Sequence, residues 1–302
     1  MEISGSKTQM TYLLDNDVLN RIERMRINPL CRNTSRHRGE QLAGRGGSNT
    51  EFSDYRDYVY GDDTRFIDWN IFSRLHRPYL KIFRLEEEMH VLIILDGSSS
   101  MNFGGKIELA KQISASFAVM ALFGGQKTSI YYVSENRSGL PKCLHNCRGC
   151  PAIKKVFSFI EKTVTCGSLP FDKAVDNVLK FHKGKGVAIL VTDFLTFGDI
   201  KRSFNLLFSA GLEIYALQIL SPAELEPEIT GDIRLLDSEN SATLDISSAG
   251  DLLHFYHEHK NAFISEIEKN VRQRSGRYVL VPSDTNIKTV LFEILLRKGW
   301  IK

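Results

Sequence analysis

The chain has 302 residues, of which 42% are apolar and 25% are charged, and its formal net charge is +3. This composition is typical of a folded globular protein and excludes a disordered or collagen-like chain. The charge balance is too even to indicate a nucleic-acid binder by itself. No apolar run approaches the ~20 residues that cross a bilayer, so we expect no membrane span.

Cysteine content and the first residues predict a cytoplasmic location. The chain has five cysteines, an odd number, and only three of them are clustered, which disfavours a disulfide scaffold. Residues 1–10 contain no apolar stretch typical of a secretion signal. We therefore expect reduced thiols in a reducing compartment.

Residues 1–44 form a polar, arginine-rich segment at the N-terminal end. Seven arginines fall within residues 21–45, where the acidic residues are Glu23 and Glu40. A solvated arm or helix is the simpler interpretation. The alternative is an electrostatic docking surface, which for a nucleic acid would give salt-dependent binding.

Residues 45–87 are dense in glycine, arginine, aspartate and aromatic residues and follow neither helical nor strand periodicity. We predict a β-rich element here, joined by a hairpin from residues 230–246. Its charged residues have two interpretations: a salt-bridge network that fixes this layer, or a face that docks a partner. The residues concerned are Arg56, Asp62, Asp63, Arg65 and Asp68.

From residue 88 onward, apolar runs alternate with segments of helical periodicity. The runs predict strands at residues 91–95, 128–133, 187–191, 213–220 and 277–281. Helical spacing predicts helices over residues 106–123, 151–162, 171–181, 200–210 and 287–298. This alternation predicts a single α/β domain over residues 88–302 with a mostly parallel sheet.

Two predicted strands end in carboxylates, Asp96 and Asp193. Ligands of open parallel sheets bind beyond the carboxyl ends of the strands, so we expect these two acids to converge. Ser98 and Ser100 add hydroxyls on one side of the first loop, and such hard oxygen atoms suit Mg²⁺. Two carboxylates ~5 Å apart repel by roughly 3 kcal/mol at an effective dielectric constant of ~20, which a divalent cation would relieve.

The sequence Asp-Gly-Ser-Ser-Ser-Met at residues 96–101 resembles the metal-ion-dependent adhesion site of von Willebrand factor type A domains. The resemblance implies a doubly wound α/β fold and an Mg²⁺ or Mn²⁺ ion. It implies that the ion is held by Asp96, Ser98, Ser100, Ser168 and Asp193. Ser168 stands where that family has threonine, and it keeps the hydroxyl. The resemblance also implies recognition, in which an acidic side chain of a partner completes the coordination of the ion.

Residues 45–69 resemble the signature of the bacterial domain-of-unknown-function family 58, in Glu-Phe-Ser-Asp-Tyr-Arg-Asp-Tyr and Gly-Asp-Asp-Thr-Arg above all. This resemblance implies a MoxR-type AAA+ ATPase as a partner. We therefore expect a non-enzymatic, metal-dependent adaptor that links the ATPase to a client in complex assembly, chaperone-like work or stress response. The alternatives are a metal-dependent hydrolase that uses the same carboxylates, and a nucleic-acid binder that uses the arginine-rich segment.

Three clustered cysteines give a competing metal signal. Cys143, Cys147 and Cys150 have a spacing known from iron–sulfur sites, and His145 lies between them as a possible zinc ligand. We favour a connecting loop with reduced thiols. A Zn²⁺ ion held by these four residues is the alternative.

Overall fold

The computed structural model describes residues 11–30, 34–35, 50–86, 89–135, 140–167, 169–227, 233–236, 243–246 and 249–302. Contacts divide the chain into a large unit, Met1–Leu30 with Met89–Lys302, and a small unit, Cys31–Glu88. Each unit is described by itself below.

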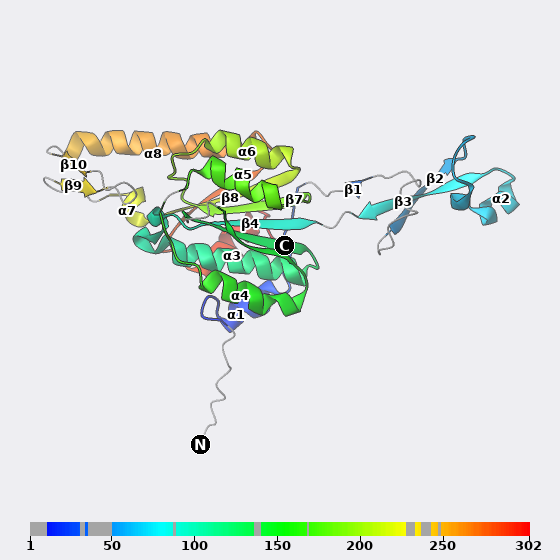
Figure 1. Cartoon of the computed structure of the whole chain (residues 1–302), viewed down its shortest axis with the longest axis horizontal. Coiled ribbons are helices and arrows are strands. Elements are labelled where there is room, and N and C mark those ends of the chain that lie inside the picture. The colour runs from blue at the N-terminus through cyan, green and yellow to red at the C-terminus, as the bar shows by residue number, and fades with distance from the viewer. Residues whose placement is uncertain are drawn as a thin grey trace, which may run out of the picture. The chain divides into compact units, whose positions relative to one another are not determined.

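A six-stranded sheet forms the centre of the large unit (Figure 1). Its strand order is β11-β8-β7-β4-β5-β6, and all neighbours are parallel except β5 and β6. The strands are β4 (His90–Asp96), β5 (Lys127–Val133), β6 (Lys142–Cys147), β7 (Gly186–Thr192), β8 (Leu212–Leu220) and β11 (Arg277–Pro282). The expected mixed α/β architecture with a mostly parallel sheet is confirmed.

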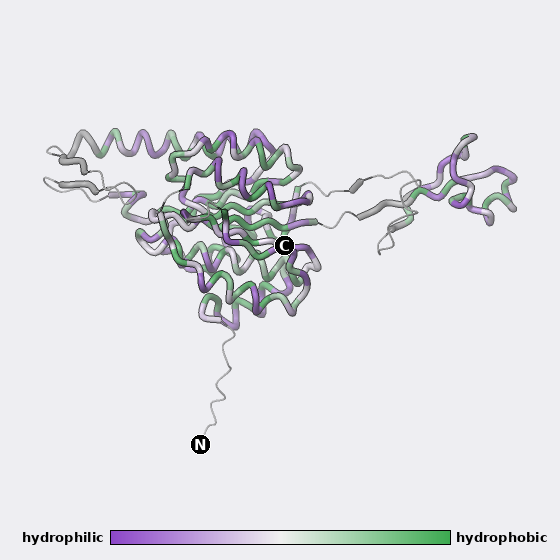
Figure 2. Tube along the Cα trace, in the orientation of Figure 1, coloured by the Kyte–Doolittle hydropathy of each residue, from purple (hydrophilic) through white to green (hydrophobic). Residues whose placement is uncertain are grey.

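The central strands are buried on both faces, which explains their uninterrupted apolar sequences. Figure 2 shows hydrophobic residues concentrated along these strands. In β4, residues 91–95 are all buried, and the whole of β7 is buried. Side chains alternate between two apolar cores: Val91 and Ile93 belong to one, and Leu92 and Ile94 belong to the other.

Helices cover both faces of this sheet (Figure 1). The first core is closed by α1 (Asn16–Ile22), α3 (Lys106–Phe123), α4 (Ile153–Glu161), α9 (Ile287–Thr289) and the π-helical turn Val290–Leu295. The second is closed by α5 (Phe171–Phe181), α6 (Ile200–Ser209) and α8 (Ala249–Arg272). Helix α3 is buried along nearly its entire length, since it lies between the sheet and other helices.

The described part of the N-terminal segment packs on the large unit. Val18 and Ile22 of α1 are fully buried in the first core. Ile27 pairs with Ile301 in an antiparallel bridge, which ties residues 26–28 to the C-terminal residues. The boundary of the large unit thus differs from the one expected from the sequence, because apolar side chains hold residues 11–30 against it.

A short hairpin and a long helix extend the large unit beyond the sheet. Strands β9 (Ile233–Leu236) and β10 (Thr243–Ile246) pair antiparallel, close to the expected hairpin. Contacts place this hairpin with the large unit, whereas the sequence interpretation joined it to the β-rich element. None of the described helices is long and apolar enough to span a membrane.

The small unit is an antiparallel sheet with one short helix. Its strands lie in the order β1-β3-β2: β1 (Thr34–Ser35), β3 (Tyr79–Glu86) and β2 (Thr50–Asp57). Helix α2 (Trp69–Leu75) begins at Asp68, whose carboxylate accepts hydrogen bonds from two backbone N–H groups of the first turn. Of its described apolar side chains, only Ile67 and Leu80 are buried, so this unit has a small core.

Candidate functional site

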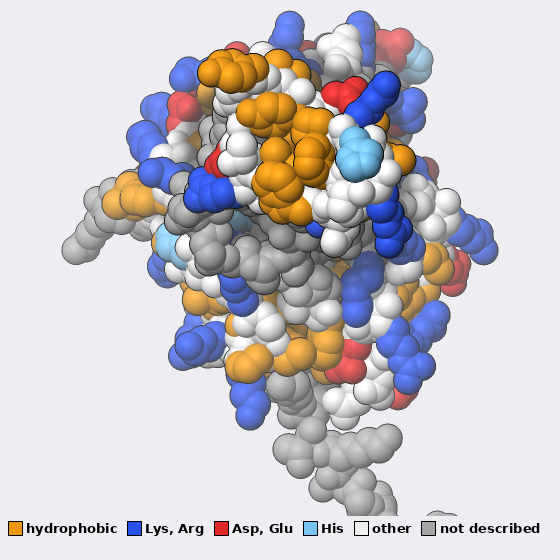
Figure 3. All heavy atoms as spheres, turned by 90° about the vertical axis from the view of Figure 1, so that its right-hand side faces the viewer, with side chains coloured by type: hydrophobic (Ala, Val, Ile, Leu, Met, Phe, Trp, Pro, Cys, Tyr) orange, Lys and Arg blue, Asp and Glu red, His pale blue; other side chains and the backbone are white. Residues whose placement is uncertain are grey.

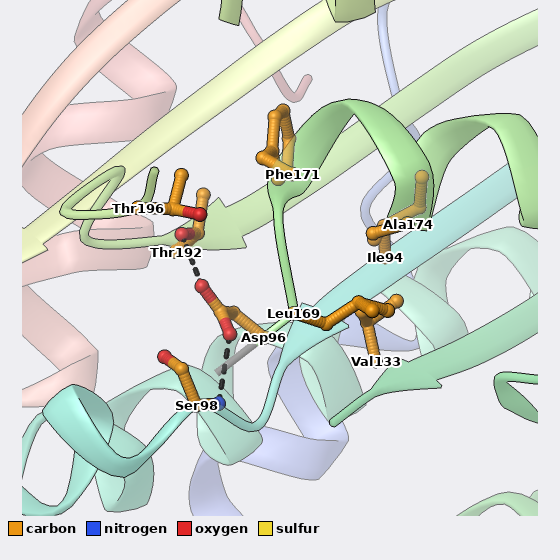
Figure 4. A pocket seen from close by; sticks show the side chains of 9 residues that line it. All are labelled: Ile94, Asp96, Ser98, Val133, Leu169, Phe171, Ala174, Thr192 and Thr196. Carbon is orange, nitrogen blue, oxygen red and sulfur yellow. Dashed lines mark hydrogen bonds between the residues drawn. The ribbon is translucent and has the colours of Figure 1, made fainter. Parts of the chain in front are cut away.

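Asp96 and Thr192 lie side by side at the carboxyl edge of the central sheet. Strands β4 and β7 pair in parallel up to Leu95 and Val191, so the next residue of each strand is Asp96 or Thr192. Thr192 Oγ1 donates to Asp96 Oδ2 at 2.5 Å, and the backbone N–H of Ser98 donates to Asp96 Oδ1 at 2.9 Å (Figure 4). These two bonds fix the orientation of the carboxylate.

The loop after β4 places two serine hydroxyls next to this carboxylate. Ser98 Oγ and Ser100 Oγ are 2.9 Å apart, and both side chains are buried. A second loop supports the first: the N–H of Ser99 donates to the carbonyl of Gly167 at 2.8 Å, and the N–H of Cys166 to that of Gly97 at 2.9 Å. The expected ligand Ser168 follows directly but lies outside the described residues.

A small pocket opens at this carboxylate, with a polar end and an apolar end (Figure 4). Thr196 Oγ1 is buried there and has no hydrogen-bond partner within the described ranges. Asp96, Ser98 and the two threonines supply the polar lining. The apolar lining consists of Ile94, Val133, Leu169, Phe171 and Ala174.

Asp193, the second expected acid, is paired with a lysine that we did not predict at the site. Lys106 Nζ donates to Asp193 Oδ2 at 2.7 Å and to Glu224 Oε1 at 2.6 Å. The side chain of Lys106 is fully buried, and that of Asp193 is 1% exposed. Leu195 N–H donates to Asp193 Oδ1 at 2.9 Å, so both carboxylate oxygens of Asp193 have partners.

The carboxyl group of Asp96 has a raised pKa. Burial removes water from the carboxyl group and is the main cause that raises the pKa of Asp96 to about 6; the negative charge of Asp193 is the second cause. Hydrogen bonds from Thr192 and Ser98 act in the opposite direction and lower this pKa. The two acids are therefore close enough to interact electrostatically, as expected. Within the described part of the chain, Asp96 has no cationic partner, so its charge is uncompensated.

The donor set around Asp96 fits a hard divalent cation. One uncompensated carboxylate and two adjacent hydroxyls supply the oxygen ligands that Mg²⁺ and Mn²⁺ prefer. Asp193 departs from the sequence interpretation, because it already neutralises Lys106. Asp96, Ser98 and Ser100 therefore fit a divalent ion and would hold it, whereas Asp193 is already paired with the lysine.

Sequence reasoning does not identify four polar residues of the site, Thr192, Thr196, Lys106 and Glu224. Thr192 precedes Asp193 directly, and strand register could have placed it beside Asp96. Lys106 was interpreted only as the start of a helix, because nothing in its sequence context distinguishes a buried lysine from an exposed one. Glu224 lies on helix α7 (Pro222–Leu225), and only the fold brings it to Lys106.

The zinc alternative at Cys143, His145, Cys147 and Cys150 is not supported by the geometry. These residues lie on or just after β6, where Cys143 packs against one core and Cys147 belongs to the other, so their thiols lie on opposite faces of the sheet. His145 Nδ1 lies 3.1 Å from the hydroxyl of Tyr131. Within the described ranges, no group of three His, Cys, Asp or Glu side chains could hold a metal.

The charged residues considered for partner docking are paired with one another or with near neighbours. Arg56 Nη2 lies 2.9 Å from Asp62 Oδ1, and Arg65 Nη2 lies 2.6 Å from Asp63 Oδ2. Asp68 caps α2 and lies 3.1 Å from Lys81 Nζ. Each acid thus has a local structural role inside the small unit.

The small unit exposes aromatic and aliphatic side chains instead. Trp69 and Leu75 of α2 are 60% and 61% exposed, and Phe72 lies between them on the same helix. Figure 3 shows hydrophobic side chains gathered over this unit, with Lys and Arg side chains around them. A contiguous exposed apolar surface of this kind is typical of an interaction site.

Comparison with known proteins identifies relatives of this chain. Residues 54–262 match the family model described as "Protein of unknown function DUF58". Uncharacterised proteins of Mycobacterium bovis and Mycobacterium tuberculosis are 22% identical over 213 residues, which cover 69% of this chain and 67% of theirs.

Solved structures with some likeness include two from Bacteroides. The conserved hypothetical protein BatB of Bacteroides thetaiotaomicron aligns with a TM-score of 0.42 and 14% identity, covering 70% of this chain and 98% of that one. An aerotolerance-related membrane protein of Bacteroides fragilis aligns with a TM-score of 0.39 and 14% identity, covering 68% and 98%.

Proposed function

The chain belongs to the DUF58 family of proteins of unknown function, and we propose that it is a non-enzymatic, metal-dependent protein-recognition module. In this proposal the large unit is a von Willebrand factor type A-like domain. It binds Mg²⁺ or Mn²⁺ through Asp96, Ser98 and Ser100, with Asp193 nearby and Ser168 as a further ligand. An acidic side chain of a partner protein completes the site.

The state of Asp96 is the observation that carries this proposal. Its carboxylate is oriented by Thr192 and by Ser98 N–H, yet no described cation neutralises it. Asp193 raises its pKa further, so the ionised form is costly without a positive charge. A cation beside the two serine hydroxyls removes that cost at neutral pH.

The chemistry of the lining favours recognition over catalysis. The described residues around the pocket offer a carboxylate, hydroxyls and apolar groups, with no histidine or cysteine among them. A nucleophile–base pair is what a metal-dependent hydrolase would need in addition to the ion. When bound, the divalent ion supplies an electrophilic position for a carboxylate oxygen, and the fixed carboxylate of Asp96 keeps that position in place.

The partner is proposed from the family resemblance. We propose a MoxR-type AAA+ ATPase and a client protein with an acidic side chain, acting in the cytoplasm in complex assembly, chaperone-like work or stress response. The exposed apolar side chains of α2 give the small unit a surface for one of these partners.

Two measurements test the proposal. Mn²⁺ titration followed by electron paramagnetic resonance should show one site in the wild-type chain and none in Asp96→Asn. Capture of a purified MoxR-type ATPase from the same organism should require Mg²⁺ and fail in EDTA. Asp199→Asn is the matched control, because the Asp199 carboxylate also accepts from a backbone N–H, that of Arg202 at the start of α6. Equal capture in Mg²⁺ and EDTA, by the wild type and Asp96→Asn alike, would exclude the metal-dependent mechanism.

A further inference from the structure

Lys106 is a fully buried cation that is paired with Asp193, one of the two acids at the sheet edge. It is the first residue of α3, reached through Gly104 and Gly105, whose positive φ angles of 58° and 74° turn the chain into the helix. Lysine is almost never fully buried unless it is paired. Here it donates to Asp193 and Glu224 at 2.7 and 2.6 Å, so the fold holds its charge between two carboxylates.

The two acids at the sheet edge therefore differ in what they can offer to an ion. Both oxygens of Asp193 are occupied, one by Lys106 and the other by Leu195 N–H. Asp96 accepts from the Thr192 hydroxyl and the Ser98 backbone N–H, and within the described part of the chain it has no cationic partner. An ion that approaches Asp193 must share its carboxylate with the ammonium group or displace that group.

We propose that Lys106 is a built-in cation that competes with the divalent ion for Asp193, weakens ion binding and couples it to helix α7. The inference rests on the proposed function, since it assumes an ion at Asp96. It concerns a different residue, however, and can fail while the metal site stands.

The coupling runs through Glu224. Its Oε2 accepts from the backbone N–H of Ser221 at 2.7 Å, and its own N–H donates to Ser221 Oγ at 3.2 Å, so the carboxylate closes the first turn of α7. The other oxygen, Oε1, holds Lys106. When an ion draws the carboxylate of Asp193 away, Lys106 keeps Glu224 as its partner. Ion binding thus shifts the lysine toward α7.

Charge balance gives a clean test of competition. Asp96, Asp193 and Glu224 carry three negative charges when ionised against the one positive charge of Lys106, which leaves two negative charges. In Lys106→Met/Glu224→Gln the two remaining acids again leave two negative charges. A change in ion affinity in this double variant therefore reports on release of Asp193 and not on net charge.

The experiment measures Mn²⁺ affinity by electron paramagnetic resonance at neutral pH, with circular dichroism to confirm folding. Lys106→Met/Glu224→Gln should bind Mn²⁺ at least roughly ten-fold more tightly than the wild type, because Asp193 becomes available. Lys111→Met is the matched control: Lys111 is also buried on α3, but it donates to the carbonyl of Thr163. Its affinity should stay within about two-fold of the wild type, because its charge lies outside the carboxylate cluster.

Glu224→Gln keeps the lysine and provides the opposite test. With Asp193 as the remaining carboxylate partner of Lys106, Mn²⁺ binding should weaken by roughly three-fold or more. Unchanged affinity in both this variant and the double variant would overturn the inference. Binding that is absent in the wild type but present in the double variant, and lost again with Asp96→Asn, would support the role of Lys106 and reject the proposed wild-type site.

Discussion

Gly97, the first residue after β4, lies directly against the ring of Tyr132. A Cβ atom at this position would stand 2.2 Å from Cζ and from the hydroxyl of that tyrosine. Gly97→Ala should therefore lower the free energy of unfolding by about 1–3 kcal/mol, because the packed ring must shift. Urea denaturation should show that Gly97→Ala lowers the free energy of unfolding by less in a Tyr132→Leu background. Equal costs in the two backgrounds would mean that the ring is not the obstacle.

His182 gives the stability of the large unit a dependence on pH. Its Nε2 is buried without a hydrogen-bond partner among the described residues. Burial, followed by the charge of His90, lowers its pKa to about 4, and His145 acts in the same direction. The folded state therefore favours neutral His182, so this contribution to stability is complete above pH ~6.5 and is lost as the pH falls toward ~4.

The corresponding experiment is a denaturation series across this pH range. Between neutral pH and pH ~4.5, the free energy of unfolding of the wild type should fall by about 2 kcal/mol more than that of His182→Phe. The phenylalanine keeps an aromatic ring but does not titrate. His254→Gln, at an exposed position of α8, should follow the wild type. Parallel curves for the wild type and His182→Phe would contradict the assignment.

Single residues also mark the limit of what the sequence predicts about the site. Asp96, Ser98 and Ser100 form a recognisable pattern because they are close in sequence, and their convergence with Asp193 follows from parallel strands. The Lys106–Glu224 pair joins residues separated by 118 positions. A lysine at the start of a helix is ordinarily exposed. The local sequence pattern therefore could not identify Lys106 as the buried partner of Asp193 and Glu224.

At the scale of elements, periodicity predicts most helices and strands of the large unit but does not predict helix α1 or strand β6. The helices at residues 106–123 and 171–181 begin and end as predicted, because glycine or proline and continuous apolar faces define them. The sequence predicts a loop where the structure has strand β6. Its sequence, Lys-Cys-Leu-His-Asn-Cys, has no apolar run, because it is a partly exposed edge strand held by main-chain pairing to β5.

Residues 26–28 pair with residues 300–302, and this pairing should stabilise the large unit. Asn28 N–H donates to the carbonyl of Trp300 at 2.9 Å, and Arg26 N–H donates to that of Lys302 at 2.8 Å. The ring of Trp300 is 2% exposed and its centroid lies 4.8 Å from that of Tyr215. The C-terminal residues thus anchor residues 26–28 to the sheet.

Comparison of the two tryptophans tests this anchor. Trp300→Ala should lower the free energy of unfolding by about 3–5 kcal/mol, because it opens a cavity between the terminal segments and β8. Trp69→Ala should lower the free energy of unfolding by less than about 1 kcal/mol, because that side chain is 60% exposed. Chemical denaturation followed by far-ultraviolet circular dichroism reports on both. A similar cost for the two variants would show that the termini do not depend on Trp300.

At the scale of the whole molecule, the chain divides into a large unit with extensive cores and a small unit with few buried side chains. The large unit contains two apolar cores and the carboxylate site, whereas the described part of the small unit buries Ile67 and Leu80 and exposes the apolar side chains of α2. Most of the buried apolar surface and the proposed ion site therefore belong to the first unit. A small core with an apolar surface is consistent with a unit whose main role is to contact a partner.

Strand pairing shows how the small unit is inserted into the chain. Thr34 pairs with Glu86 and Ser35 with Leu85, so the chain enters and leaves this unit along adjacent antiparallel strands. A short linker can therefore bridge the insertion without pulling the large unit apart. We expect a variant in which a Gly/Ser linker replaces residues 34–86 to fold, because α1 and residues 89–302 retain their cores.

This variant separates ion binding from partner docking. Its melting temperature and Mn²⁺ affinity should remain close to those of the full chain, since Asp96, Ser98, Ser100 and Lys106 all lie in the large unit. Capture of the MoxR-type ATPase, which should require the ion, should also weaken in this variant if the exposed apolar side chains of α2 supply a second contact. Trp69→Ala in the full chain should reduce capture in the same direction, by about ten-fold for an aromatic residue at the centre of an interface. Full capture by the shortened chain would instead place the partner on the large unit, at the metal site itself.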